Sequence, residues 1–92
     1  MFPYGPATVR KVGLCSGAAS DLLETAAAVG CDLYLTGELA ERAGELAKEL
    51  QITLVAAGHV ATEVFGAMRL ADELRMKFPG LHAEFVAVDN PL

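Results

Sequence analysis

The sequence predicts an α/β fold, with a mainly parallel four-stranded sheet in βαβαβαβ order and three helices, in a single domain spanning residues 1–92. Three observations support this prediction. Apolar runs of strand length alternate with segments of helical spacing, the connections between them are short, and glycine marks most of these connections. Strict strand–helix alternation is typical of parallel sheets with right-handed crossovers.

The first strand–helix unit begins with Val9–Cys15, an apolar β run that ends in the small-residue turn Ser16–Ser20. Asp21–Val29 carries leucines and alanines at helical spacing, and a serine of the turn can cap it. Gly30 then ends the helix, as a glycine just beyond a helix C-terminus commonly does. These residues predict one complete βα unit.

The next βαβ unit has equally distinct parts. Asp32–Thr36 is predicted as the second strand, and Leu39–Leu50 as a helix with one apolar and one charged face. Ile52–Ala57 is almost wholly apolar, as expected for a central parallel strand that is buried on both faces.

The longest predicted helix is Thr62–Phe78, which Pro79–Gly80 ends. Ala83–Val88 follows, and its imperfect alternation of apolar and polar residues predicts a fourth strand. Asp89–Leu92 is interpreted as a tail, in which Asp89 has no predicted position relative to the sheet.

Composition and charge exclude several classes of function. The net charge is −5 and the seven basic residues are scattered, so nucleic-acid binding is not expected. No apolar run approaches the roughly 18 residues of a membrane span, and the first residues lack the features of a signal peptide. The expected compartment is the cytoplasm. Cys15 and Cys31 are predicted to be free thiols, because they lie at opposite ends of adjacent strands.

Apolar residues make up 53% of the chain, which is more than a monomer of this size easily buries. We therefore expect an exposed apolar face that contacts another subunit or another domain. An alanine-rich, tightly packed core is the alternative explanation.

The polar residues that could carry chemistry follow the predicted strands. Ligands of open α/β sheets bind beyond the carboxyl ends of the strands. The three strand–helix junctions read Cys15-Ser16-Gly17, Thr36-Gly37-Glu38 and Gly58-His59-Val60-Ala61-Thr62-Glu63. We expect all three junctions at one edge of the sheet.

His59 and Glu63 are the candidate metal ligands. Side chains four residues apart share a helix face, and imidazole and carboxylate can bind one divalent transition metal such as Zn, Fe, Mn or Co. Two ligands do not close a site, so others must come from elsewhere. The structural alternative makes Thr62 the helix N-cap, Glu63 an acid favoured by the helix dipole, and His59 a loop residue.

Glu38 is the candidate catalytic residue, either as a general base or as an acceptor for a metal-binding histidine. Its alternative role is that of an acidic residue at a helix N-terminus. The Ser16–Ser20 turn could hold a phosphate at a helix N-terminus, but it lacks the dinucleotide-binding and P-loop patterns. Its glycine has an alternative role in close packing of helix and strand. His82, in a polar turn, is expected to be exposed.

Taken in order, these segments resemble the carboxy-terminal half of the Nif-three-like dinuclear metal centre family, whose members are often called GTP cyclohydrolase type 2 homologues. The resemblance covers nearly the whole chain. Its most specific parts are T-G-E and the downstream G-H-x-x-T-E. The segments that carry it are Phe2–Pro6, Ser16–Ala19, Asp32–Glu38, Ala57–Glu63 and Asp89–Pro91.

The resemblance implies a two-metal centre in which His59 and Glu63 are ligands and Glu38 lies beside them. It also implies a hexameric assembly and a metal-dependent hydrolase of unsettled substrate. Family members are more than twice this length, and their amino-terminal half supplies further ligands. Many members carry a histidine a few residues after T-G-E, and none is present here between Leu39 and Glu45. The position after His59 is often aromatic or a second histidine in the family, and here it is Val60.

Three functions follow as hypotheses. The first is a metal-binding domain of a dinuclear-metal-dependent hydrolase, incomplete and inactive as this chain alone. It would be completed by a homo-oligomer or by a complementary amino-terminal half, and would act on a small-molecule substrate. The second is a non-catalytic oligomerising or scaffold module with vestigial metal ligands. The third is a nucleotide-binding or regulatory domain that uses the Ser16–Ser20 turn.

Overall fold

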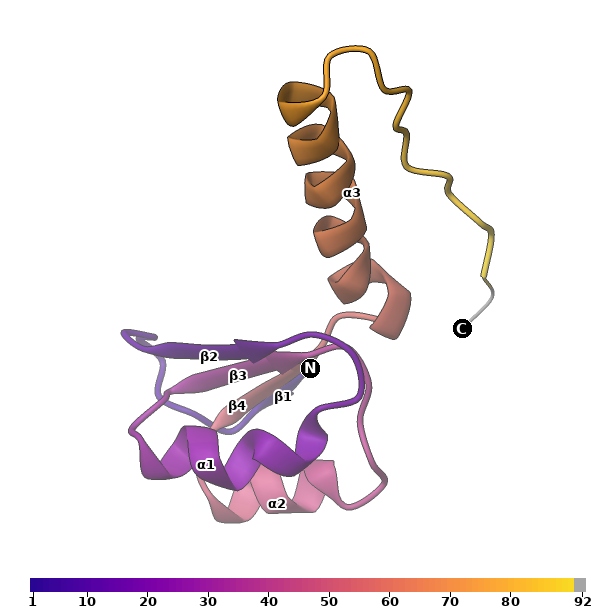
Figure 1. The fold of residues 1–92 in the computed structure, drawn as a ribbon. Coiled ribbons are helices and arrows are strands. Elements are labelled where there is room, and N and C mark those ends of the chain that lie inside the picture. Colours follow the sequence, from indigo (N-terminus) through magenta and orange to yellow (C-terminus); the bar gives the residue numbers. More distant parts are fainter. Residues whose placement is uncertain (91–92) are drawn as a thin grey trace.

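The computed structural model describes residues 1–90. It contains four strands, one of them only two residues long, together with three α-helices and a short 3-10 helix. Figure 1 shows their arrangement. In chain order the elements are β1 (Phe2–Pro3), β2 (Val12–Cys15), η1 (Ser20–Leu22), α1 (Leu23–Ala28), β3 (Leu33–Thr36), α2 (Ala43–Glu49), β4 (Thr53–Ala56) and α3 (His59–Lys77).

The sheet is mixed, with the strand order β1-β4-β3-β2. β2 pairs with β3 and β3 with β4 in parallel, whereas β1 pairs antiparallel to β4. The predicted mainly parallel sheet in βαβαβαβ order is therefore wrong. The fourth strand comes from the amino terminus, where a two-residue segment containing Pro3 is too short to produce a pattern of alternation. Proline is tolerated there because β1 is an edge strand.

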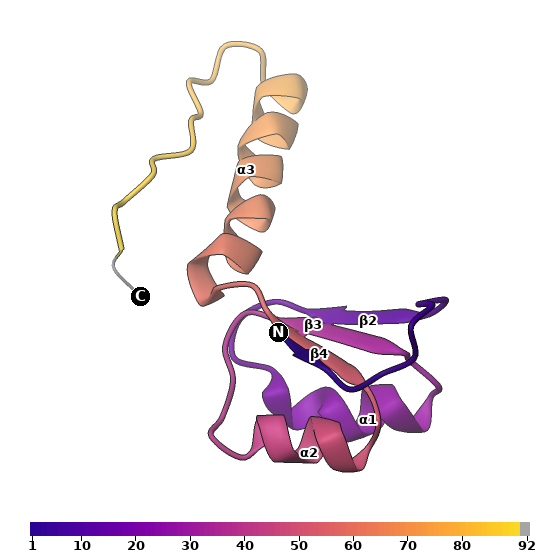
Figure 2. The same cartoon turned by 180° about the vertical axis from the view of Figure 1, so that it is seen from behind.

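The predicted strand Ala83–Val88 is also wrong, because residues 81–90 contain no strand. The preceding helix carries the chain away from the sheet by about 28 Å, at 1.5 Å per residue over 19 residues. The segment then returns beside α3, as Figures 1 and 2 show from opposite sides. It meets no strand with which its alternating residues could pair. The predicted tail lies partly outside the described residues, since 91 and 92 are not described.

The core lies between the sheet and the two short helices. α1 and α2 cover the same face of the sheet (Figure 2). Alanines on these helices let the backbones approach the sheet closely, and leucine, isoleucine and tyrosine side chains fill the remaining space. The buried core residues are Leu23, Ala26, Tyr34, Ala43, Ala47, Ile52 and Leu54.

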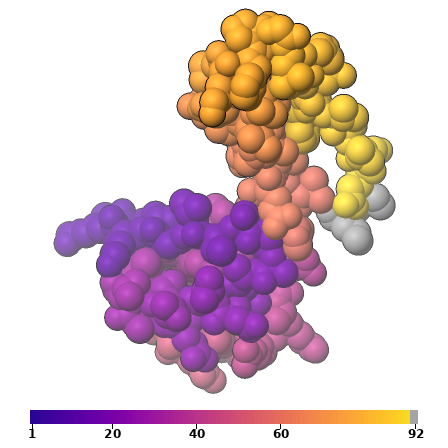
Figure 3. All heavy atoms as spheres, in the orientation of Figure 1, coloured from indigo at the N-terminus to yellow at the C-terminus, as the bar shows by residue number. Residues whose placement is uncertain are grey.

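Within residues 1–90, no helix packs along the opposite face of the sheet. Val12 and Leu14 project there with 51% and 76% of their surface exposed, and Leu33, Leu35 and Val55 are half-buried. The helix α3 leaves from the end of the sheet instead of lying across this face (Figure 3). The molecule therefore has a compact body, formed by the sheet with α1 and α2, and a projecting arm, formed by α3 and the segment that returns beside it. The radius of gyration is accordingly 16.5 Å, against about 12 Å for a compact chain of this length.

The projecting arm is itself rich in exposed apolar side chains, among them Phe65, Leu70, Met76, Val86 and Val88. Together with Val12 and Leu14, they agree with the expectation of an exposed apolar face. Within residues 1–90, no helix is both long and apolar enough to cross a membrane. Cys15 and Cys31 are free thiols, as predicted, but both are half-buried and not the buried thiols that the sequence led us to expect.

Candidate metal centre

The three strand–helix junctions meet at one edge of the sheet. Cys15, Thr36 and Ala56 are aligned across the parallel strands β2, β3 and β4, so the following residues leave the sheet side by side. Backbone hydrogen bonds join the junctions directly. The Gly37 N–H donates to the Gly17 carbonyl and the Gly58 N–H donates to the Gly37 carbonyl, each over 2.9 Å.

Glycine is required where the junctions touch. A Cβ atom on Gly37 would lie 2.6 Å from Thr62 Oγ1 and 2.8 Å from both the Gly17 carbonyl oxygen and the His59 Cα. A side chain on Gly17 would overlap the Glu63 carboxylate, and Gly17 also has a φ of +69°, which favours glycine. These two glycines therefore permit the close approach of the segments that carry Glu38, His59 and Glu63.

Two threonine hydroxyls hold the same region together. Thr36 is fully buried; its Oγ1 donates to the Gly17 carbonyl over 3.1 Å and accepts from the Ala19 N–H over 3.2 Å. Thr62 Oγ1 accepts from the Gly17 N–H over 3.0 Å. This role was not predicted for either hydroxyl. The sequence feature that could have indicated it is their position, because Thr36 ends β3 and Thr62 lies near the beginning of α3.

His59 lies between two carboxylates. Its Nδ1 is 2.8 Å from Glu38 Oε2 and its Nε2 is 3.3 Å from Glu63 Oε2. A carboxylate has no proton to donate, so Nδ1–H is the donor to Glu38. The exposed fraction of the side chain is 40% for His59, 61% for Glu38 and 52% for Glu63. The structure thus brings all three predicted site residues into one cluster.

The carboxylates also raise the pKa of His59 above its ordinary value of 6.5. The hydrogen bond to Glu38 is the main cause, and the negative charges of Glu63 and Glu38 add to it, while partial desolvation opposes it. A positively charged imidazole is therefore favoured at this position. A divalent cation on Nε2 would benefit from the same two negative charges.

The helix α3 begins earlier than predicted, and this changes the interpretation of its first residues. His59 is the first helical residue and Gly58, with a φ of +94°, precedes it as the N-cap residue. Thr62 is therefore not the N-cap. Glu63 lies beyond the first turn, which contains no acidic residue, so the helix dipole does not account for its position.

The donor atoms present fit one side of a transition-metal site. In a tetrahedral site, donors about 2.0–2.2 Å from one ion are separated by about 3.3–3.6 Å, and His59 Nε2 and Glu63 Oε2 are 3.3 Å apart. Glu38 occupies the other imidazole nitrogen, as carboxylates do behind metal-binding histidines. Among residues 1–90, however, no group of three or more His, Cys, Asp or Glu side chains is arranged to hold a metal.

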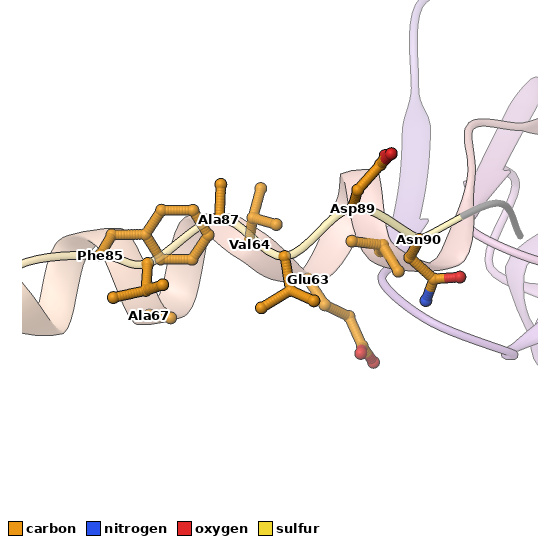
Figure 4. A pocket seen from close by; sticks show the side chains of 10 residues that line it. Glu63, Val64, Ala67, Phe85, Ala87, Asp89 and Asn90 are labelled. Carbon is orange, nitrogen blue, oxygen red and sulfur yellow. The ribbon is translucent and has the colours of Figure 1, made fainter.

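The remaining acidic and basic candidates lie elsewhere. Asp89 lines a groove of about 550 Å³ between α3 and the returning segment, together with Glu63 and apolar residues such as Val64 and Phe85. Figure 4 shows that the Asp89 and Glu63 side chains project in different directions. His82 is an exposed residue, 86% accessible, and its Nε2 lies 3.4 Å from Glu84 Oε2.

The Ser16–Ser20 turn uses its amides inside the protein. The Gly17 N–H donates to Thr62 and the Ala19 N–H to Thr36, while the Ser20 hydroxyl accepts from the Ala40 N–H rather than capping a helix. The turn also faces the Glu63 carboxylate. These contacts favour the close-packing role of this turn over a phosphate site.

Comparison with known proteins identifies the family. A family model for Duf34/NIF3 (NGG1p interacting factor 3) matches residues 1–91. Proteins described as "GTP cyclohydrolase 1 type 2 homolog" are 38% identical over 87 residues in Haemophilus influenzae and 40% identical over 84 residues in Allochromatium vinosum. The matches cover 95% and 91% of this chain, but 34% and 33% of the relatives.

A solved structure shares the fold of this chain. Protein ybgI, described as of unknown function, superimposes on 100% of this chain with a TM-score of 0.91 and 33% sequence identity, over 37% of its own length. A superposition over the whole chain includes the projecting α3, so this arrangement is shared with a longer protein. The chain spans about a third of the length of the curated relatives it matches, and it belongs to the Duf34/NIF3 family.

Proposed function

We propose that this chain contributes the ligand pair His59 and Glu63 to a divalent transition-metal centre of a metal-dependent hydrolase. The observation that carries the proposal is the two-sided environment of one imidazole. Its Nδ1 is held by Glu38 at 2.8 Å, and its Nε2 faces Glu63 at 3.3 Å. An imidazole oriented from Nδ1 presents Nε2 as a ligand in a fixed direction.

Glu38 has a defined part in this proposal. Because it accepts the Nδ1–H bond, it fixes the tautomer of His59 and makes Nε2 more basic. This position agrees with the acceptor role considered for Glu38, and it uses one of the two carboxylate oxygens, Oε2. A bound metal would supply a Lewis acid and an activated water at neutral pH.

The ligand set of this chain is incomplete, which sets a limit on the proposal. Two side chains do not close a site, and the relatives named as GTP cyclohydrolase 1 type 2 homologues are about three times as long as the segment matched here. We expect further ligands from a complementary polypeptide or from another copy of the chain, and no turnover by this chain alone.

Calorimetric titration with Zn²⁺ tests the ligand assignment. We expect His59→Ala and Glu63→Gln to abolish the binding that the unaltered chain shows. The chain offers a matched control, because His82 and Glu84 form a second exposed His–Glu pair in which no carboxylate of residues 1–90 pairs with the other imidazole nitrogen. His82→Ala and Glu84→Gln should bind Zn²⁺ normally. Binding that survives His59→Ala would refute the assignment.

The open face of the sheet supports a second candidate, an assembly module. Leu14 is 76% exposed in the middle of a strand, and burying such a side chain contributes roughly 1.5–3 kcal/mol. The partner we favour is a polypeptide equivalent to the part of the longer relatives that this chain does not match. In protein ybgI the matched segment is 37% of the chain, so most of that protein is available to cover it.

Co-expression tests this second candidate. The tagged chain is expressed with the unmatched two-thirds of the Haemophilus influenzae relative, and co-purification is measured. We expect a complex that Leu14→Glu disrupts and that Val29→Glu, at an exposed helix end, leaves intact. Failure to co-purify, with the chain eluting as a self-associated species, would replace this partner by a second copy.

A further inference from the structure

We infer that the Thr62 hydroxyl is a positioning group, which joins the beginning of α3 to Gly17 and so holds the His59 imidazole in register with Glu38. Its relevance to metal binding rests on the proposed function. The structural part, which concerns the His59–Glu38 contact alone, does not.

The hydroxyl uses both of its hydrogen-bonding capacities. Oγ1 accepts from the Gly17 N–H at 3.0 Å, and its proton is directed toward the carbonyl oxygens of Gly58 and His59, each at 2.9 Å. Thr62 thus bonds to the backbone of the residue that carries the imidazole. A valine at this position has nearly the same shape but can make none of these bonds.

Gly17 transmits this contact to Glu38. While its N–H bonds to Thr62, its carbonyl oxygen accepts from the N–H groups of Gly37 at 2.9 Å and Glu38 at 3.0 Å. Gly17 is therefore bonded to the Glu38 backbone on one side of the His59–Glu38 contact and to the Thr62 hydroxyl on the other. The spacing between those two side chains depends on this bridge.

Apolar packing does not provide an alternative restraint. Beyond its first turns, α3 projects away from the compact body, and its contacts with the other described elements are sparse. The Thr62 hydrogen bonds and the backbone bond from Gly58 to Gly37 are consequently the main contacts that fix the direction of α3 where His59 begins it. Loss of one of them changes the direction in which Nε2 points.

Three proteins test the inference, namely Thr62→Val, the conservative variant Thr62→Ser, and Thr25→Val as a control on the exposed surface of α1. Three readouts are compared with the unaltered chain. They are hydrogen exchange of the Gly17 amide, the ring-nitrogen chemical shifts of His59 at one fixed pH, and Zn²⁺ affinity. Removing groups that orient metal ligands typically lowers metal affinity about 10- to 100-fold.

We expect Thr62→Val to speed Gly17 exchange at least tenfold, to shift the Nδ1 resonance, and to weaken Zn²⁺ binding about tenfold or more. Thr62→Ser and Thr25→Val should resemble the unaltered chain in all three. A normal His59 ring spectrum in folded Thr62→Val overturns the inference. If Thr62→Val does not fold, an unprotected Gly17 amide in the unaltered chain overturns it, and protection with a wild-type-like Thr62→Ser supports it.

The two proposals fail separately. If neither the unaltered chain nor its complex with the co-expressed partner binds Zn²⁺, the proposed ligand role fails, while the exchange and ring-nitrogen readouts still decide the role of Thr62. If Zn²⁺ binds but Thr62→Val changes neither the ring-nitrogen chemical shifts of His59 nor the Zn²⁺ affinity, the positioning role fails and the ligand role stands.

Discussion

Replacing Thr36 with valine removes one buried hydroxyl and little else, because the two side chains have nearly the same shape. The hydroxyl is fully buried, donates to the Gly17 carbonyl and accepts from the Ala19 N–H. The lost bond to Gly17 costs about 1 kcal/mol, since that carbonyl keeps its two amide donors. The Ala19 N–H, left without its acceptor, costs about 1–3 kcal/mol more. A methyl in place of the hydroxyl returns roughly 0.8 kcal/mol of apolar burial.

We therefore expect Thr36→Val to lower the free energy of unfolding by about 2 kcal/mol, measured by urea denaturation with an unchanged m-value. Thr25→Val is the control, because Thr25 is exposed on α1 and surface substitutions usually stay within about 0.5 kcal/mol. A Thr36→Val protein as stable as this control would show that the junctions are held by packing, and that the hydroxyl network contributes nothing measurable.

Three further changes test the same region and its surroundings. Gly37→Ala should destabilise the fold by more than about 3 kcal/mol in denaturation experiments, because the added Cβ atom would lie 2.8 Å from backbone atoms. Gly66→Ala should instead stabilise α3 by about 0.5–1 kcal/mol, because a Cβ atom at that position has no neighbour within 4 Å. Glu38→Gln should lower the pKa of His59 in an NMR titration, because the hydrogen bond to Glu38 is the main cause that raises it; Glu84→Gln should not, and an unchanged His59 curve in Glu38→Gln would contradict the geometry. Asp32 accepts the N–H groups of Arg10 and Lys11, which lower its pKa from 3.8. Its contribution is present above the unfolded pKa and is lost as pH falls through the lowered folded pKa. Asp32→Asn should therefore be less stable than the unaltered chain at neutral pH, with a difference that shrinks as the pH falls below 3.8 and through the folded pKa; a difference that does not depend on pH would refute this account.

The central part of the fold was predictable from the sequence because its elements have strong local signals. The strands β2, β3 and β4 lie within the predicted runs, and the helices between them are where periodicity predicts them, although α1 and α2 are shorter. The amino-terminal strand was not predictable. Phe2 and Pro3 form a strand only through pairing with Leu54 and Thr53, and such long-range pairing leaves no local pattern.

The failed prediction of a strand at Ala83–Val88 has a different physical cause. Alternation of apolar and polar residues shows that a segment suits a half-buried surface, and it does not identify that surface. In this chain the segment lies along α3, where Phe85 and Val86 line a groove with Val64. An alternating pattern is therefore compatible with a segment that packs against a helix, and it does not require a strand.

The candidate site was more accessible to sequence reasoning than the sheet around it. Parallel strands place their carboxyl ends at one edge, so Glu38 and His59 were expected together once their strands were identified. The position of the imidazole between two carboxylates, with one at each ring nitrogen, was not predictable. It depends on the start of α3 at His59 rather than at Thr62, and on hydroxyl contacts that connect residues 45 positions apart.

The position of this cluster connects the two candidate functions. Glu38 belongs to the compact body, whereas His59 and Glu63 belong to α3, so the cluster spans the joint between body and arm (Figure 1). A polypeptide that covered the open sheet face and the apolar residues of α3 would restrain the angle between them. In our proposal the same polypeptide supplies the missing ligands. Assembly and metal binding should therefore be thermodynamically linked, with each strengthening the other by the same factor. In the co-expression experiment, Leu14→Glu should then weaken Zn²⁺ binding although Leu14 contacts no ligand, and equal Zn²⁺ affinity with and without the partner would refute the linkage.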